Sequence, residues 1–232
     1  MKFRSLHRWD VTPKEAVQLQ RKLRDRVAIE PTQISKIRTV AAADVSFDKK
    51  RPDVAFAALV VCSFPDLQEI ARLYAPVRIT FPYIPGLLSF REVPPLLKVF
   101  GVLQSPICNL KCDVILVDGH GYAHPRRFGA ACHLGLSLDI PTVGCAKSVL
   151  VGDYREPALN SGSWSPLIHN GETVGRAVRT RVGVAPVFVS VGHRVDLDSA
   201  TEIVLACVRK FRIPVPQRAA HLLSNQLRLE LR

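Results

Sequence analysis

The hydrophobic and polar positions in the first third of the chain predict one helix followed by three strands. Thr12 and Glu15 have the spacing of a capping box with a proline between them, and the apolar residues that follow recur at helical spacing. The next segments are rich in β-branched residues and are separated by turn-forming stretches. We therefore expect strands at 40–47, 54–64 and 69–79, arranged as a meander.

The rest of the chain alternates short apolar strands with helical patterns. Ser89 and Glu92 repeat the capping-box spacing, which predicts a helix from 89 to about 103. Further strands are predicted at 113–117, 142–145, 174–181 and 187–191, and further helices at 128–138, at 199–211 and after Pro216. Strands first, and then strands alternating with helices, predict an α/β domain around a mixed sheet. Because the sequence has no repeats and no linker-like stretches, we expect residues 1–232 to form one domain.

The charge of the chain indicates a polyanionic partner. The sequence has 32 Lys and Arg against 20 Asp and Glu, a formal net charge of +12. Such an excess is typical of nucleic-acid-binding proteins, although basic proteins without such a partner are also common. No apolar run approaches the ~20 residues of a membrane span, and the first residues lack the apolar core of a signal peptide. A soluble, cytoplasmic protein is expected.

Cysteine usage agrees with an intracellular protein. The 6 cysteines in 232 residues are too few for a disulfide scaffold. Most of them lie in apolar segments, where a free thiol packs like a small hydrophobic side chain. We expect reduced core residues at Cys62, Cys132, Cys145 and Cys207.

Two aspartates occupy strand positions that favour chemistry. Asp44 interrupts the small-apolar segment 40–47, where an ionised carboxylate is unfavourable unless a metal or hydrogen bonds compensate it. The alternative is a solvated face shared by Asp44 and Ser46. Asp118 follows the buried strand 113–117, at the strand end where open α/β sheets place ligands. A turn-forming aspartate before a glycine is the alternative there.

The loop after Asp118 is dense in glycine and in cationic side chains. Its glycines allow the backbone to approach a nucleotide closely. Arg126 and Arg127 are predicted to contact phosphate, because arginine is a common phosphate ligand in nucleic-acid complexes.

A stiff apolar segment precedes Glu92. Pro82 and Pro85 bracket Tyr83 and Ile84 and hold these two side chains on an extended loop. Apolar wedges of this kind separate base steps in DNA, whereas packing of the loop on the core is the alternative. Taken alone, Glu92 is explained by helix capping, and the neighbouring wedge is what favours a place for it in a site.

Carboxylates without a Cys or His cluster suit a hard cation such as Mg²⁺, with Mn²⁺ as a substitute. Asp44, Glu92 and Asp118 are the predicted ligands, and such an ion would promote phosphodiester hydrolysis. Lys147 follows a predicted strand and is placed to neutralise charge on phosphate. His221 is a candidate proton donor or acceptor, and a purely structural histidine is the alternative.

Several motifs together resemble the endonuclease V family. They span residues 43–47, 80–86, 90–92, 117–121, 123–126, 144–148, 190–194 and 218–221. The resemblance implies an RNase H-like fold, with a central mixed β-sheet flanked by helices. It also implies Mg²⁺-dependent cleavage of DNA that contains deoxyinosine, the product of adenine deamination. The implied cut is at the second phosphodiester bond 3′ to the lesion and leaves 3′-hydroxyl and 5′-phosphate ends.

The resemblance also implies roles for individual residues. The implied catalytic residues are Asp44, Glu92, Asp118, His221 and Lys147, of which the three acids hold the metal. The implied wedge is centred on Tyr83, and the implied base pocket, largely main chain, comprises Gly86, Leu88, Gly121, Gly129 and Leu150. Two positions depart from the family pattern: His120 stands where an amide side chain is usual, and Ala130 replaces a bulkier aliphatic residue.

Three alternatives to a deoxyinosine endonuclease stay open from the sequence. An inosine-specific endoribonuclease shares all the motifs, and another RNase H-like nuclease shares the acids but does not need the wedge at 82–86. A non-catalytic basic nucleic-acid-binding protein is the third, although three convergent carboxylates repel phosphate. The expected partner is DNA containing deoxyinosine, bound by a monomer.

Overall fold

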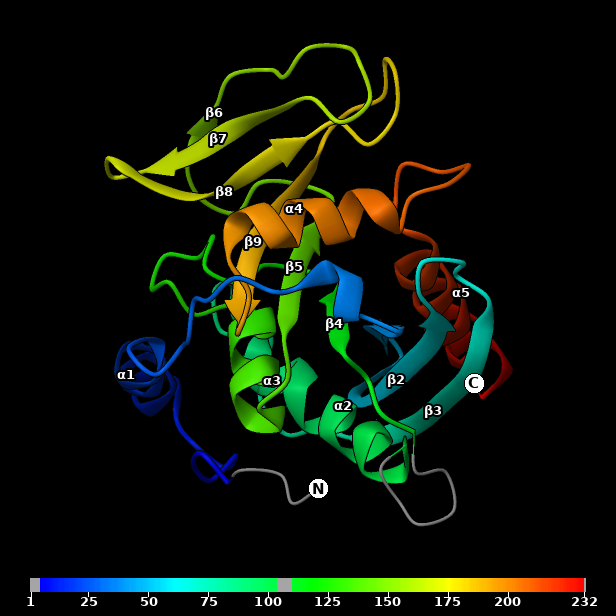
Figure 1. The fold of residues 1–232 in the computed structure, drawn as a ribbon. Helices are drawn as coiled ribbons and strands as arrows, with labels where there is room; N and C mark the ends of the chain where they lie inside the picture. Colours follow the sequence, from blue (N-terminus) through cyan, green and yellow to red (C-terminus); the bar gives the residue numbers. More distant parts are fainter. Residues whose placement is uncertain (1–4, 104–109, 232) are drawn as a thin grey trace.

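A mixed sheet of nine strands forms the centre of the computed structural model, which describes residues 5–103 and 110–231 (Figure 1). Its strands are β1 (Thr39–Asp48), β2 (Arg51–Ser63), β3 (Glu69–Arg78), β4 (Val114–Val117), β5 (Thr142–Ala146), β6 (Asp153–Tyr154), β7 (Trp164–His169), β8 (Glu172–Val178) and β9 (Val187–His193). They lie in the order β3-β2-β1-β4-β5-β9-β8-β7-β6. The first three form the predicted antiparallel meander. β4 and β5 run parallel to β1, and β9 is antiparallel to β5.

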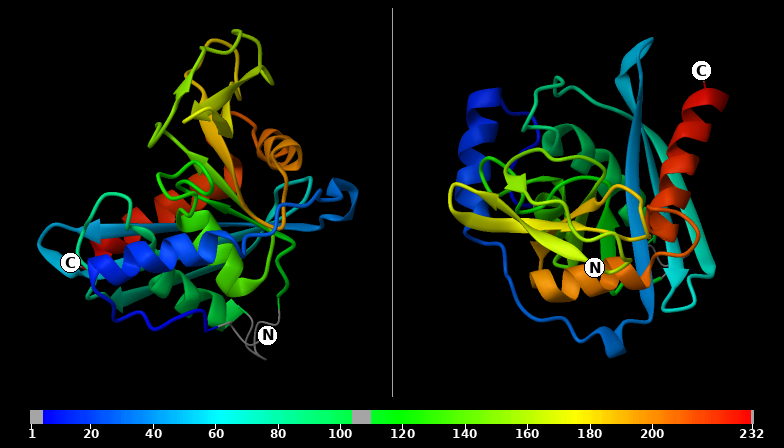
Figure 2. Two further views of the ribbon diagram at one scale, coloured as in Figure 1. Left: turned by 90° about the vertical axis from the view of Figure 1, so that its left-hand side faces the viewer. Right: turned by 90° about the horizontal axis from the view of Figure 1, so that it is seen from above.

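Helices cover both faces of the part of the sheet built from β1 to β5 (Figure 2). They are α1 (Pro13–Arg24), α2 (Ser89–Leu103), α3 (Ala130–Leu138), α4 (Leu197–Ala206) and α5 (Val215–Glu230), with a short 3-10 helix η1 (Ile34–Lys36). α2 and α3 pack on one face, α5 packs on the other, and α4 packs against β8 and β9. The outer strands β6, β7 and β8 extend beyond this body. Within the described residues no helix is long and apolar enough to cross a membrane.

The two-residue period of β1 decides which face each of its side chains meets. Ala41 and Ala43 pack with the hydrophobic residues of α2 and α3. Val40 and Ala42 pack on the opposite face, with residues of α4 and α5. Because alternate residues of a strand point to the same face, Asp44 continues the second series and is directed towards α5.

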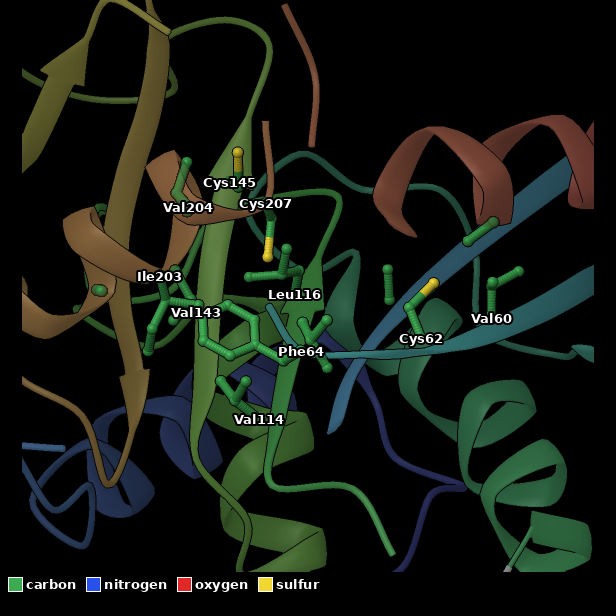
Figure 3. Packing of buried hydrophobic residues seen from close by; sticks show 14 of the residues in the cluster. Val60, Cys62, Phe64, Val114, Leu116, Val143, Cys145, Ile203, Val204 and Cys207 are labelled. Atoms are coloured by element: carbon green, nitrogen blue, oxygen red, sulfur yellow. The ribbon is translucent and has the colours of Figure 1, made fainter. Parts of the chain in front are cut away.

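The core on that second face contains three of the cysteines (Figure 3). Cys62, Cys145 and Cys207 are buried there among aliphatic side chains from the sheet and α4, and Cys132 is buried in a separate cluster under α1. All four are free cysteines, so the expectation of reduced core residues is confirmed.

Most predicted elements are confirmed to within a few residues. α1 begins at the predicted capping box: the N–H of Glu15 donates to the Thr12 hydroxyl, and the Glu15 carboxylate accepts from the Thr12 N–H at 2.8 Å. α4 differs, because Asp196 caps it three residues before Ser199 and it ends at Ala206. The strands β6 and β7 were not predicted.

The capping box predicted at Ser89 and Glu92 is wrong. Ser89 already lies inside α2, and its hydroxyl contacts His133 Nδ1 at 3.2 Å. The backbone N–H of Glu92 donates to the carbonyl of Leu88 at 2.9 Å, so the Ser89 hydroxyl does not cap it. The Glu92 carboxyl group is therefore free of a capping role.

Candidate active site

Two parallel strands bring Asp44 and Asp118 side by side. β1 and β4 pair in register, with Ala43 opposite Val117, so the next residue of each chain segment is an aspartate. The N–H of Asp118 also donates to the Ala43 carbonyl at 3.4 Å. The pairing of the strands thus places both carboxylates at the same edge of the sheet, where ligands of α/β proteins bind.

α5 supplies the groups that face Asp44. His221 and Ser224 are three residues apart and therefore lie on one side of the helix. The Ser224 hydroxyl donates to the Asp44 carboxylate, and the Ser46 hydroxyl donates to the Ser224 carbonyl at 2.7 Å. Asp44 is only 9% exposed, so a solvated face shared with Ser46 is excluded. Sequence reasoning missed Ser224, although its spacing from His221 could have found it.

His221 and Lys147 complete the group around the two aspartates. His221 Nδ1 lies 3.6 Å from Asp44 Oδ1 and 3.9 Å from Asp118 Oδ2. Lys147, which directly follows β5, contacts Asp118 Oδ2 at 2.5 Å. The structure thus brings together four of the five residues predicted to be catalytic, from β1, β4, α5 and the end of β5.

Glu92, the fifth, lies at the side of this group. Glu92 lines the same hollow as Asp118, and its carboxyl group interacts electrostatically with both Asp44 and Asp118. Burial raises the pKa of Glu92 to about 8, and the two aspartates push the pKa in the same direction. Glu92 therefore tends to keep its proton at neutral pH while the negative charge beside it is uncompensated.

The two aspartates have opposite pKa shifts. Burial raises the pKa of Asp44, but hydrogen bonds from His221 and Ser224 outweigh burial and leave the pKa below its ordinary value. Burial dominates at Asp118 and raises the pKa of that carboxyl group despite the bond from Lys147. The hydrogen bond to Asp44 raises the pKa of His221, which favours its protonated form.

This donor set fits a hard divalent cation. One ligand atom from each of Asp44, Asp118 and His221 lies within 4.8 Å of the others, and this is the group found among the described residues. Carboxylate oxygens are the ligands that Mg²⁺ and Mn²⁺ prefer in proteins. Burial, and then the neighbouring carboxylates, raise the pKa of Glu92 and Asp118, and a cation beside these two groups would favour their ionised forms.

A hollow of about 250 Å³ opens directly beside the acids. Because residues that the sequence predicts for the base pocket line it, we call it the lesion hollow. Its lining includes Glu92 and Asp118, together with Tyr83, Gly86, Leu88, His120, Gly129 and Leu150. Four of the five residues predicted for the base pocket are therefore present. Gly121 is not among them: a Cβ there would lie 2.0 Å from the Val191 carbonyl oxygen, so its glycine serves close packing against β9.

The segment predicted to be a wedge lies at the rim of the lesion hollow. Tyr83 is 68% exposed, and Pro82 and Pro85 are also exposed. Ile84 differs from the prediction, since it is half-buried and packs with Phe81 and its neighbours. The available wedge is thus the tyrosine between the two prolines.

Arg126 and Arg127, which the sequence predicts to contact phosphate, are bonded to groups inside the protein. Arg127 is 9% exposed, and its guanidinium binds Glu172 at 2.7 Å and the His124 carbonyl at 3.0 Å. Arg126 donates to the Gly86 carbonyl at 2.6 Å. These bonds tie both arginines to the loop and to the segments beside it.

Comparison with known proteins agrees with this geometry. The family model of endonuclease V matches residues 21–222. The chain belongs to the endonuclease V family. A curated endonuclease V from Methanothrix thermoacetophila is 49% identical over 224 residues, which cover 97% of this chain and 96% of that protein. The chain is accordingly a hydrolase of the endonuclease V type.

Solved endonuclease V structures share the whole fold. The Streptomyces avermitilis protein matches with a TM-score of 0.89 at 43% identity, covering 96% of each chain. The Ciona intestinalis protein, solved as a D234N variant in complex with a 23mer DNA containing an inosine followed by a ribo-adenosine, matches with a TM-score of 0.86 at 30% identity and covers 96% of this chain and 100% of that one. A more distant likeness to A. aeolicus Argonaute, with a TM-score of 0.55 at 13% identity, concerns the fold alone. The predicted RNase H-like α/β fold is confirmed.

Proposed function

We propose that this endonuclease V hydrolyses DNA at deoxyinosine, cutting the second phosphodiester bond 3′ to the lesion. The observation that carries the proposal is the shared wall of the site: Glu92 and Asp118 line the lesion hollow, and Asp118 also belongs to the group that fits a metal. When a base is held in the hollow, the backbone of the strand that carries this base lies close to Glu92 and Asp118. The Ciona intestinalis relative, solved with a DNA that contains an inosine followed by a ribo-adenosine, supports recognition of an inosine-containing strand.

Asp44 and Asp118 are the residues that would hold Mg²⁺, or Mn²⁺ in its place, with Glu92 as the third acid at the edge of the site and His221 beside them. When bound, such an ion polarises the scissile phosphate and lowers the pKa of the attacking water. The protein supplies the remaining electrostatics. Lys147, bound to Asp118, is placed to offset charge that develops on phosphate oxygens.

In the proposed reaction, a water oxygen gives up a proton to the solvent as it bonds to phosphorus, and the bond from phosphorus to the 3′ oxygen breaks. The products are a 3′-hydroxyl and a 5′-phosphate. His221 is placed to hold the proton that the leaving 3′ oxygen takes, since its pKa is raised by Asp44. Ser224 orients Asp44 through its hydroxyl and so acts as a positioning residue.

Lesion selection in this proposal depends on the hollow and its rim. Gly86 and Gly129 let the wall of the hollow approach a base closely, because neither carries a side chain. A backbone N–H such as that of Gly86 can distinguish the hydrogen-bonding edge of hypoxanthine from that of adenine. Tyr83 is placed to occupy the gap that a flipped nucleotide leaves. An inosine pair is weaker than a normal pair, which lowers the free energy needed to extract the base.

We further infer that residues 1–232 act as one catalytic domain, as a monomer in the cytoplasm. The first and last helices both contact the elements of the site: Gln20 of α1 binds the Gly86 carbonyl, and Ser224 of α5 binds Asp44. Removal of either end would therefore disturb the same centre.

Matched oligonucleotides that differ only in one inosine or adenine test the proposal. With Mg²⁺, we expect cleavage of the inosine strand alone, one nucleotide beyond the lesion on its 3′ side. Equal cutting of both strands would indicate another RNase H-like nuclease, and binding without cutting would indicate a non-catalytic protein. The same sequence made as RNA separates an endoribonuclease from a DNA repair enzyme, since preferred cutting of the RNA would overturn the assignment to DNA.

A further inference from the structure

A second hollow, which we call the downstream hollow, lies on the other side of the Lys147–Asp118 ion pair. Its volume is about 430 Å³, and its lining includes Lys147 and His221 from the catalytic group. The lesion hollow instead touches that group through Glu92 and Asp118. The two hollows share no lining residue, and the ion pair between Lys147 and Asp118 joins a lining residue of one hollow to a lining residue of the other.

The chemistry of the downstream hollow suits a nucleotide. Lys147, Arg212 and Arg218 line it, together with Phe211 and Leu222, and no carboxylate is among its lining residues in the described part of the chain. The guanidinium carbon of Arg218 lies 4.0 Å above the ring of Phe211, which is 44% exposed. An exposed aromatic ring beside a guanidinium is a platform on which bases of any sequence stack.

The cationic groups there are not all satisfied by the protein. Within residues 5–103 and 110–231, the Arg218 side chain has no hydrogen bond or ion pair besides its contact with the Phe211 ring. Arg212 donates to the carbonyls of Lys147 and Pro186, while its Nε is buried without an acceptor. Arg218 thus differs from the inward-bonded Arg127, and it is free to meet phosphate.

The position of the proposed cut gives this hollow an occupant. A cut at the second bond 3′ to the lesion leaves one nucleotide between the flipped base and the scissile phosphate. Suppose that the base fills the lesion hollow and that the scissile phosphate lies at Asp44 and Asp118. The second nucleotide 3′ of the lesion, which follows the scissile phosphate, then lies beyond Lys147 and His221. We propose that the downstream hollow binds that nucleotide, the one that carries the new 5′-phosphate, with its base stacked on Phe211 and Arg218. This inference rests on the proposed function.

Single-turnover cleavage of two inosine-containing single strands tests the inference. One strand is normal, and the other carries a tetrahydrofuran abasic residue as the second nucleotide 3′ of inosine. The wild type should cut the abasic strand at least about 5-fold more slowly, in line with the loss of one stacked base. Phe211→Leu and Arg218→Gln should cut the normal strand more slowly and lose most of the difference between the two strands.

A matched control removes a similar stack elsewhere. Trp164 is 49% exposed beneath Arg176, at 3.8 Å, and lines neither hollow, so Trp164→Leu should keep the wild-type difference. Circular dichroism of each variant separates loss of folding from loss of stacking. Equal wild-type rates on both strands, or a full difference retained by folded Phe211→Leu, would overturn the inference and leave the proposed function intact. Failure of the wild type to cut any inosine strand would overturn the proposed function itself.

Discussion

The side-chain amide of Gln20, in α1, donates a hydrogen bond of 3.0 Å to the carbonyl of Gly86, at the wall of the lesion hollow. The same carbonyl accepts from Arg126 at 2.6 Å and from His124 Nε2 at 2.9 Å. Gly86 has a φ of +76°, which a side chain would strain, so the turn needs both its glycine and these donors. The segment that carries Tyr83 is therefore anchored from two distant parts of the chain.

Replacement of Gln20 by leucine should loosen this anchor. Gln20 is 1% exposed and also donates to the Phe128 carbonyl, so the change leaves buried polar groups unpaired and should lower the free energy of unfolding by about 1–3 kcal/mol. We expect a higher KM for inosine-containing DNA with a smaller change in kcat, measured by steady-state cleavage. Gln18→Leu, at an exposed position of the same helix, is the control. Equal KM values for the two variants would contradict the anchoring role.

Ser224→Ala should weaken metal binding without removing a metal ligand. The Ser224 hydroxyl orients Asp44 and lowers the pKa of that carboxyl group. Groups that orient metal ligands typically change metal affinity by about 10–100-fold, so the Mg²⁺ concentration for half-maximal cleavage should rise by that order. Ser137→Ala is a suitable control, because Ser137 is equally buried but bonds only within α3. An unchanged Mg²⁺ dependence in Ser224→Ala would argue against this role.

Tyr83→Ala should affect duplex DNA more than single strands. A wedge is needed only where a base must leave a stack, and separating a base step requires a few kcal/mol. We expect cleavage of an inosine-containing duplex to fall at least about 10-fold, with a smaller decrease on the single strand, in a time course on both substrates. Tyr74→Ala removes another exposed tyrosine, on β3, and should change neither rate. Equal losses on duplex and single strand would indicate that Tyr83 contacts the lesion and is not a wedge.

His124 makes stability depend on pH in a defined direction. Its Nε2–H donates to the Gly86 carbonyl and its Nδ1 accepts the N–H of Arg126, so the ring must be neutral. Burial, and then the charge of Arg126, lower the pKa of His124 to about 4. The unfolded chain, with a pKa near 6.5, binds the proton more readily, so the stabilisation is complete above pH ~6.5 and is lost as the pH falls towards 4.

Urea unfolding of the wild type and His124→Asn checks this direction. The variant is expected to be less stable at pH 7.5, because it loses the two bonds. The gap in the free energy of unfolding should narrow on acidification, by up to about 3 kcal/mol between pH 6.5 and 4. The other titrating groups contribute equally to both proteins, so their contributions cancel in the difference between the two free energies of unfolding. A gap that widens at low pH would contradict the assignment of a neutral His124.

Most helices and strands could be predicted from the sequence, and so could the two aspartates that interrupt or end an apolar strand. Asp44 and Asp118 stand out because each interrupts or ends an apolar strand, where an uncompensated charge is unfavourable. β7 could not be predicted in the same way. It contains Pro166, and proline within a run argues against a strand, yet the residue lies near the outer edge of the sheet, where it is tolerated.

The roles of polar side chains on helices and loops depend on partners that sequence does not reveal. Gln20 and Ser224 look like ordinary helical residues until the fold brings Gly86 and Asp44 to them. Arg127 looks like a phosphate ligand until Glu172, from a distant hairpin, is found beside it. Ser89 has capping-box spacing, but its contact with His133 is decided by tertiary packing.

In the proposed mechanism, Asp44 and Asp118 hold the metal ion that promotes cleavage, and this metal site lies next to the lesion hollow. Asp44→Asn and Asp118→Asn preserve shape and remove one negative charge each. Loss of a direct ligand should exceed the effect of a group that only orients one, so cleavage should fall by more than about 100-fold. Binding of the same DNA should persist or improve, because a carboxylate that repels phosphate is gone.

The most direct measurement is single-turnover cleavage of an end-labelled inosine-containing strand by the wild type and these two variants, with Mg²⁺ and with the binding of each protein measured in parallel. We expect the wild type to cut at the second phosphodiester bond 3′ to inosine, and both variants to bind the strand without cutting it. Cleavage by Asp44→Asn or Asp118→Asn at the wild-type rate would show that these carboxylates do not hold the metal.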